Sequence, residues 1–156
     1  MKRTTFARTA ALTAALAAVT GAAVAVGPAF AGQSGSAEHG TPGTGQILPH
    51  PGPDGVLWIP DWIGDGGAVT VAGNSMPATV TVGCRGGSGS AGEVQVRFTP
   101  SYGDLTPVEF TVACPADTVG LGSVVVAAET SRSFQVGVTA SAPDVHWGLT
   151  VTQPDA

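Results

Sequence analysis

The sequence predicts an all-β protein: a small antiparallel β-sandwich, of immunoglobulin-like or jelly-roll-like type, with about seven strands and one disulfide. Three observations predict this fold class. From residue 69 onward, short runs alternate apolar with polar residues, and clusters of Gly, Pro, Ser, Asn and Asp separate them. Two cysteines continue the apolar faces of two of these runs. Beyond the N-terminal leader, no stretch of helical length carries an apolar stripe with a 3.6-residue period.

The first 31 residues have the features of a secretory signal peptide. Three basic residues lie among the first eight, an apolar stretch follows over residues 10–26, and Ala29-Phe30-Ala31 forms a small-x-small cleavage site. The apolar stretch is shorter than the roughly 20 residues that a membrane span needs. We therefore expect a secreted, extracellular protein that is cleaved after Ala31 and has no membrane span in the mature chain.

Charge excludes two classes of partner. The chain has 156 residues and a net charge of −5, and removal of the leader leaves three arginines against eleven acidic residues, a net charge of −8 with no lysine. Nucleic acids and anionic membrane surfaces are bound through clusters of Lys and Arg. Neither is expected as a partner, and we expect an unidentified protein or glycan ligand instead.

Residues 32–55 are predicted to be a flexible lead-in. They are rich in Gly, Ser, Thr and Pro, and Ile47 and Leu48 are the only large apolar residues among them. Such a segment buries too little surface to offset its ordering entropy. His39 and His50 in this segment lack the Cys/His spacing of a metal site, so neither a metal nor a cofactor is expected. The remaining residues, 56–156, are expected to form the sandwich domain.

The strand predictions depend on side-chain alternation. One face of each run carries Val, Phe, Trp or Leu and the other carries Thr, Gln, Glu or Arg, which is typical of half-buried strands. One run, 124–126, is apolar throughout. Two antiparallel sheets packed face to face bury these faces most economically, and a small β-barrel is the alternative. The expected strands are 69–71, 80–84, 94–98, 108–114, 124–126, 134–140 and 145–151.

The two cysteines are expected to pair. Cys84 continues the apolar face of Val82 and Cys114 continues that of Val112, so both point inward from the ends of different strands. In an exported chain this predicts one structural disulfide between Cys84 and Cys114. A catalytic thiol would need a base and an electropositive setting, whereas Asp117 follows Cys114 closely.

The most unusual local feature is a tandem repeat, WIPD followed at once by WIGD, at residues 58–65. Residues four apart share a face, so Trp58 and Trp62 are candidates for a two-indole platform that holds a sugar ring or a protein. A calcium loop would use Asp61 and Asp65, but two carboxylates supply too few of the ion's ligands. The third interpretation is structural: the segment covers an open end or edge of the sandwich and buries its indoles.

Three other features bear on function. The loop at residues 99–107, with Tyr102 at its centre, is the better-constrained binding candidate. Arg85 precedes a Gly- and Ser-rich loop at residues 86–92, which we interpret as flexible. His146 alternates out of phase with its apolar neighbours and is expected to face solvent or a sheet edge.

These features predict a non-catalytic binding or structural module, extracellular or at the cell surface, with Trp58, Trp62 and Tyr102 as its possible binding surface. The alternative is a secreted inhibitor of an extracellular hydrolase, a protease or glycosidase, which would use Arg85 or the loop at 99–107. We expect no catalytic residues and no enzyme activity, because the sequence shows neither a nucleophile–base pair nor a ligand cluster.

Overall fold

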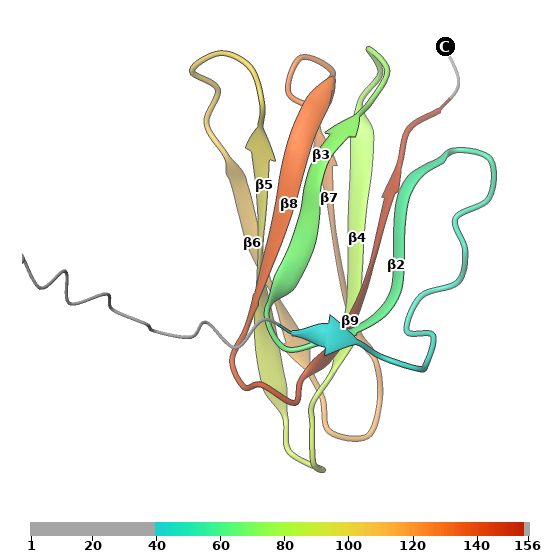
Figure 1. Cartoon of the computed structure of the whole chain (residues 1–156), viewed down its shortest axis with the longest axis vertical. Helices are drawn as coiled ribbons and strands as arrows, with labels where there is room; N and C mark the ends of the chain where they lie inside the picture. The colour runs from blue at the N-terminus through green and yellow to red at the C-terminus, as the bar shows by residue number, and fades with distance from the viewer. Residues whose placement is uncertain (1–39, 155–156) are drawn as a thin grey trace, which may run out of the picture. The chain divides into compact units, whose positions relative to one another are not determined.

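Nine β-strands in the described part of the chain form two antiparallel sheets (Figure 1). The computed structural model describes residues 40–154, with the backbone alone at 68–72. The predicted signal peptide, residues 1–31, and the first part of the predicted lead-in lie outside the described residues. The strands are β1 (Thr41–Pro42), β2 (Gly55–Ile63), β3 (Gly66–Ala72), β4 (Ala78–Arg85), β5 (Gly92–Pro100), β6 (Val108–Cys114), β7 (Gly120–Val126), β8 (Ser133–Ala140) and β9 (His146–Thr152).

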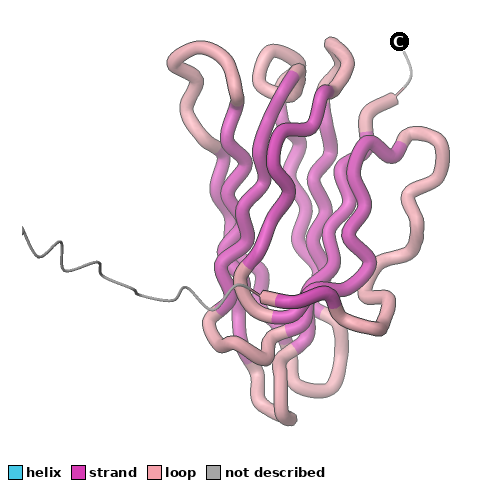
Figure 2. Tube along the Cα trace, viewed as in Figure 1, coloured by secondary structure: helices cyan, strands magenta, loops and turns pink. Residues whose placement is uncertain are grey.

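The two sheets pack face to face as a sandwich. The strand order is β1-β2-β9-β4-β7 in one sheet and β3-β8-β5-β6 in the other, and neighbouring strands are antiparallel. Figure 2 shows the strands other than the short β1 running along the long axis, with loops gathered at both ends. The predicted sandwich is confirmed, and the barrel alternative is wrong because the two sheets remain separate. Each of the seven predicted strands overlaps one of β3 to β9.

Alternating side chains of both sheets fill the space between them. In β5, Val94, Val96 and Phe98 are buried, whereas the residues between them are exposed. Phe98 stacks on Phe134 of β8, with ring centroids 4.4 Å apart. Burying this apolar surface stabilises the fold by about 25 cal/mol per Å². The alternation in the sequence therefore identified the core-facing side chains of these strands.

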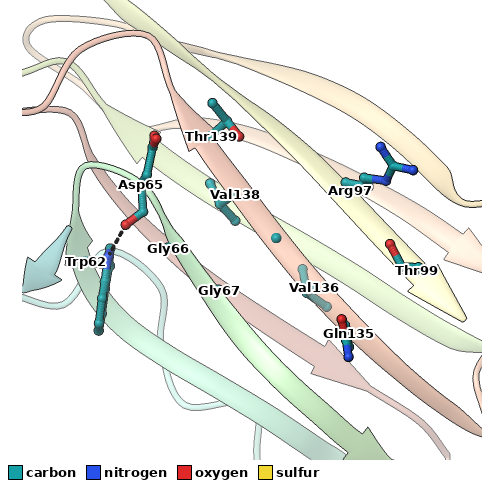
Figure 3. A pocket seen from close by; sticks show the side chains of 11 residues that line it. Trp62, Asp65, Gly66, Gly67, Arg97, Thr99, Gln135, Val136, Val138 and Thr139 are labelled. Atoms are coloured by element: carbon teal, nitrogen blue, oxygen red, sulfur yellow. Dashed lines mark hydrogen bonds between the residues drawn. The ribbon is translucent and has the colours of Figure 1, made fainter. Parts of the chain in front are cut away.

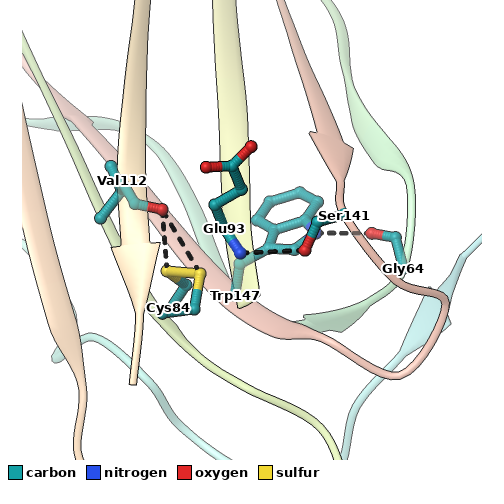
Figure 4. The surroundings of a disulfide bond; sticks show 7 residues. Gly64, Cys84, Glu93, Val112, Ser141 and Trp147 are labelled. Atoms are coloured by element: carbon teal, nitrogen blue, oxygen red, sulfur yellow. Dashed lines mark hydrogen bonds between the residues drawn. A yellow bond between two sulfur atoms is a disulfide. The ribbon is translucent and has the colours of Figure 1, made fainter. Parts of the chain in front are cut away.

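The disulfide joins the two sheets at one end of the sandwich. Cys84 is the last inward-facing residue of β4, and Cys114 is the last residue of β6. The two form a disulfide with their Cα atoms 5.0 Å apart. Both side chains are fully buried, next to Trp147 of β9 (Figure 4). The predicted pairing of Cys84 with Cys114 is confirmed. We call this end the disulfide end.

Residues 40–50 run from β1, at the edge of the five-stranded sheet, onto the outer face of that sheet, and we call them the N-terminal strap. Gly43 N–H donates to the Asp61 carbonyl over 3.1 Å, and Ile47 N–H donates to the Pro60 carbonyl over 2.7 Å. The side chain of Leu48 is buried. The structure therefore differs here from the predicted flexible lead-in.

Two glycines explain why the strap is ordered. A side chain at Gly83 of β4 would collide with Leu48, and one at Gly148 of β9 would collide with Ile47, so the two glycines leave a recess for the strap. Ile47 and Leu48 fill that recess, and the strap's backbone bonds to β2. The sequence predicted a flexible segment because two large apolar side chains bury little surface by themselves. The recess that receives them is formed by strands far along the chain, so it could not be recognised from the segment alone. Within residues 40–154 no helix is long and apolar enough to cross a membrane.

Candidate functional site

The tandem WIPD–WIGD segment forms most of β2, and a bulge divides its two tryptophans. Ile59 pairs with Leu149 of β9, but the next pair joins Trp62 to Trp147. Pro60 and Asp61 therefore lie together opposite one residue, as in a β-bulge, a position that tolerates proline. The extra residue reverses the side-chain alternation.

The two indoles consequently lie on opposite faces of the sheet. Trp58 is on the outer face, where its Nε1 donates to the Leu48 carbonyl over 3.3 Å and the His50 ring meets it edge-on. Trp62 is on the inner face beside Trp147, with ring centroids 6.2 Å apart. Both indoles are half-buried. The structure does not bring them together as a platform, and β2 is a paired strand instead of a cover over an open end.

Asp61 was considered in the sequence only as a calcium ligand, and its burial and its pairing with His146 were not predicted. Its side chain is only 1% exposed; Oδ2 accepts the Gly45 N–H over 2.9 Å and Oδ1 lies 3.0 Å from Nδ1 of His146. His146 was expected to face solvent or a sheet edge. It does alternate out of phase with the core residues of β9, but its side chain is only 23% exposed, because the bulge turns Asp61 onto the outer face beside it. The signal in the sequence was Pro60, a residue that interrupts a regular strand.

The Asp61–His146 pair has the arrangement that orients a catalytic imidazole in hydrolases. In the described residues, however, no Ser, Thr or Cys side chain hydrogen bonds to His146. Through these contacts, Asp61 of β2 is hydrogen-bonded to the strap at Gly45 and to β9 at His146. Asp65 binds elsewhere, since its Oδ1 accepts the Ala140 N–H over 2.7 Å, so the two carboxylates of the repeat do not share one ion. Among residues 40–154 no three His, Cys, Asp or Glu side chains group as a metal site.

A groove of about 730 Å³ opens at the end of the sandwich opposite the disulfide. Three loops meet there: β3–β4, β5–β6 and β7–β8. Tyr102 is 72% exposed and Leu105 is 40% exposed, both on the β5–β6 loop, and Gly103 between them adopts a positive φ of 71°. We call this feature the end groove. Its lining residues are Gly73, Ser75, Pro100, Tyr102, Gly103, Asp104, Leu105, Glu129, Arg132 and Ser133.

Three charged residues line the end groove together with its apolar side chains. Nε and Nη2 of Arg132 each lie 3.3 Å from the Ser75 hydroxyl oxygen, and Arg132 has no carboxylate within ion-pair distance in the described structure. Asp104 and Glu129 add two carboxylates. A concave apolar surface with a few polar groups around it is the usual form of a ligand site.

A buried polar network fixes two of the three loops. Gln153, just past β9, has its side chain buried, and its Nε2 donates to the Met76 carbonyl over 2.8 Å and contacts the Ser131 hydroxyl at 3.2 Å. Its Oε1 accepts the Asn74 N–H over 3.0 Å. The Ser131 hydroxyl donates to the same Met76 carbonyl over 2.7 Å. Ser75 and Arg132, next along the chain, are therefore held in place, while the β5–β6 loop stands exposed beside them.

Replacing Gln153 with Ala is expected to lower the free energy of unfolding by about 2–3 kcal/mol, because it leaves several buried polar groups unpaired. Urea denaturation followed by tryptophan fluorescence measures the change. Gln135→Ala in β8 is the matched control, since that side chain is exposed, and its effect should stay within about 0.5 kcal/mol. Equal effects of the two variants would contradict the role given to Gln153.

A second groove, of about 570 Å³, lies on the outer face of β8 (Figure 3). Arg97, Gln135 and Thr139 project from its walls, and glycines of β3 and β8 form part of its floor. Trp62 borders it, but its Nε1 already donates to the Asp65 carbonyl over 3.0 Å. We call it the sheet-face groove. Its lining contains no strongly exposed large apolar side chain, so the end groove is the better candidate site.

At the disulfide end, the loop after Arg85 is more ordered than the sequence predicted. Ser90 N–H donates to the Gly87 carbonyl over 2.8 Å, and Ser88 and Gly89 between them both have positive φ, as in a type I′ turn. The tip of this turn is therefore Ser88-Gly89, and Arg85 lies at its base, exposed, at the end of β4.

The structure thus separates the three predicted binding residues: Trp58 lies under the strap, Trp62 lies against the core, and Tyr102 is displayed in the end groove. No family model, curated protein or solved structure matches this chain.

Proposed function

We propose that the protein is a secreted, non-catalytic binding module, extracellular or at the cell surface, whose ligand occupies the end groove. The observation that carries the proposal is that exposed apolar side chains lie beside two loops that a buried hydrogen-bond network holds in place. Tyr102 and Leu105 expose apolar area on one loop, and Gln153 holds the two neighbouring loops from below. Binding residues are often found on loops positioned by a rigid scaffold.

The chemistry of the groove suits a protein or glycan ligand. The Tyr102 ring offers a flat apolar face to a sugar ring or an apolar side chain, and Tyr is enriched among residues that dominate binding energy. Arg132, Asp104 and Glu129 supply donors and acceptors at the rim. Secretion is supported by the disulfide, since such bonds persist in oxidising compartments.

Truncating the displayed side chains tests this proposal. We expect wild-type protein to give hits in a glycan array or a displayed-peptide library, and the double variant Tyr102→Ala/Leu105→Ala to weaken those hits by about 100-fold, the loss of two binding hot-spot side chains. Val119→Ala is the matched control, because Val119 is also exposed but lies at the disulfide end. Hits that the double variant leaves unchanged would contradict the proposal.

Inhibition of an extracellular hydrolase is the second candidate function. It is favoured by the β5–β6 loop, which projects from the end of the sandwich with Tyr102 exposed (Figure 1). Arg85 is the weaker contact for this role, because it lies at the base of a tight turn. A panel of secreted proteases and glycosidases separates the two functions: an inhibitor lowers turnover of one enzyme and loses that effect in Tyr102→Ala, whereas a binding module leaves every enzyme unaffected.

A further inference from the structure

β7 forms one edge of the five-stranded sheet, and its inward-facing glycines, Gly120 and Gly122, pack closely on β6 of the other sheet. It pairs with β4 over seven consecutive residues without a register shift, and it has no other strand partner in the described part of the chain. Its outward side chains are apolar or small: Leu121 is 67% exposed and Val125 is 69% exposed, with Ser123 between them. An open, regular edge is a template for pairing with another strand.

The other three sheet edges carry features that block such pairing. β1 is two residues long and includes Pro42, which has no N–H to donate. β3 is interrupted by a register shift between Ala68 and Val71. β6 carries Glu109, ion-paired at 3.3 Å with Arg97. β7 has no charge, proline or bulge, and no charged residue occurs anywhere in 118–128.

We propose that two copies of this chain associate through antiparallel pairing of β7 with β7, about a two-fold axis at Ser123. This register is self-complementary: Ser123 faces Ser123, and Leu121 of each copy faces Val125 of the other. Directly opposed side chains of this kind stabilise antiparallel pairs. A closed two-fold interface of this type uses the same patch on both copies.

Charge favours a second copy at this edge over other faces. Without the predicted leader each chain carries a net charge of −8, so two copies repel each other wherever their carboxylates meet. The β7 edge carries no charged residue. Asp117 and Glu129 flank it, and their carboxylates confine the strand pairing between two copies to the residues between them. Arg85 on β4, level with residue 119 of β7, has no ionic partner in the described residues. In the pair it approaches the end of the second copy's β7, where Glu129 follows.

The pairing gives a continuous ten-stranded sheet and a bivalent molecule. Because the two β7 strands run in opposite directions, the two end grooves point away from each other. A ligand displayed repeatedly on a surface or polymer would then be held with avidity. The dimer itself does not depend on the function proposed for the end groove.

Sedimentation equilibrium of the mature protein over a range of concentrations tests the proposal. Wild type is expected to show a monomer–dimer equilibrium, and Ser123→Lys to weaken association by about tenfold or more, because it opposes two like charges on the axis. Thr111→Lys is the matched control, since Thr111 is exposed on the edge strand β6. A wild type that is monomeric up to about 1 mM, or equal weakening by both variants, would overturn the proposal.

Cross-linking tests the register separately. Under mild oxidation, Ser123→Cys is expected to form a covalent dimer, because the two side chains face each other across the axis. Val125→Cys is expected to remain monomeric, since it faces Leu121 of the second copy. The reverse pattern would overturn the proposed pairing.

Discussion

Replacing both cysteines, Cys84→Ala with Cys114→Ala, is expected to lower the free energy of unfolding by about 3.5 kcal/mol. The disulfide closes a loop with a sequence separation of 30 residues, and in the chain-entropy model a loop of that length restricts the unfolded chain by about this amount. It is also the covalent link between β4 and β6, which belong to different sheets. Urea denaturation with the linear extrapolation measures the change.

A reductant provides the control for this variant. Adding dithiothreitol to the wild type should reproduce the loss, and adding it to the double variant should change nothing. A wild type whose unfolding is unaffected by reductant at full reduction, as verified by mass spectrometry, would contradict the structural role of the disulfide.

Trp147→Ala is expected to cost about 3–5 kcal/mol, the range for removing a large buried aromatic side chain. Trp147 is fully buried, and its Nε1 donates to the Gly64 carbonyl over 2.7 Å. It also packs beside the disulfide, as the Cα partner of Cys84 (Figure 4). The substitution therefore opens a cavity and leaves a carbonyl unpaired where the two sheets are linked.

Trp147→Phe separates these two effects and keeps the measurement possible if the alanine variant does not fold. It retains most of the ring but not the donor, so we expect a loss of about 1–3 kcal/mol from the unpaired Gly64 carbonyl and the smaller ring. Trp58→Phe is the matched control, because its indole is half-buried and its hydrogen bond is longer, at 3.3 Å. Equal losses from both phenylalanine variants would contradict the central packing role of Trp147.

The strands and the disulfide could be predicted from the sequence because both are recorded in a local pattern. Alternation around Val94, Val96 and Phe98 reports directly which side chains face the core. The phase of Cys84 and Cys114 on two such runs also reports that their side chains face inward. A period of two needs no knowledge of which strand lies next to which.

The position of the indoles could not be predicted because one inserted residue changes it. Spacing by four places Trp58 and Trp62 on one face only if the strand is regular, and the bulge at Pro60 and Asp61 breaks that regularity. The partner that fixes the bulge, Gly148, lies far along the chain. Local spacing therefore gave the wrong face for one of the two tryptophans.

The support of the end groove also depends on contacts between distant residues. The loop around Tyr102 was recognisable from its turn residues, but Gln153 is a lone polar residue near the end of the chain. Its role follows only when β9 is placed beside the β3–β4 and β7–β8 loops, where it bonds to Asn74, Met76 and Ser131. The strap is ordered for the same kind of reason, through glycines of β4 and β9.

The most direct test of the end groove as the binding site is a nuclear magnetic resonance titration. Protein labelled with nitrogen-15 is titrated with the strongest oligosaccharide or peptide from the library screen, and the shifted backbone amides are mapped. We predict that the shifts centre on Ser75, Tyr102 and Arg132. Shifts confined to Arg97 and Gln135, in the sheet-face groove, would contradict the assignment.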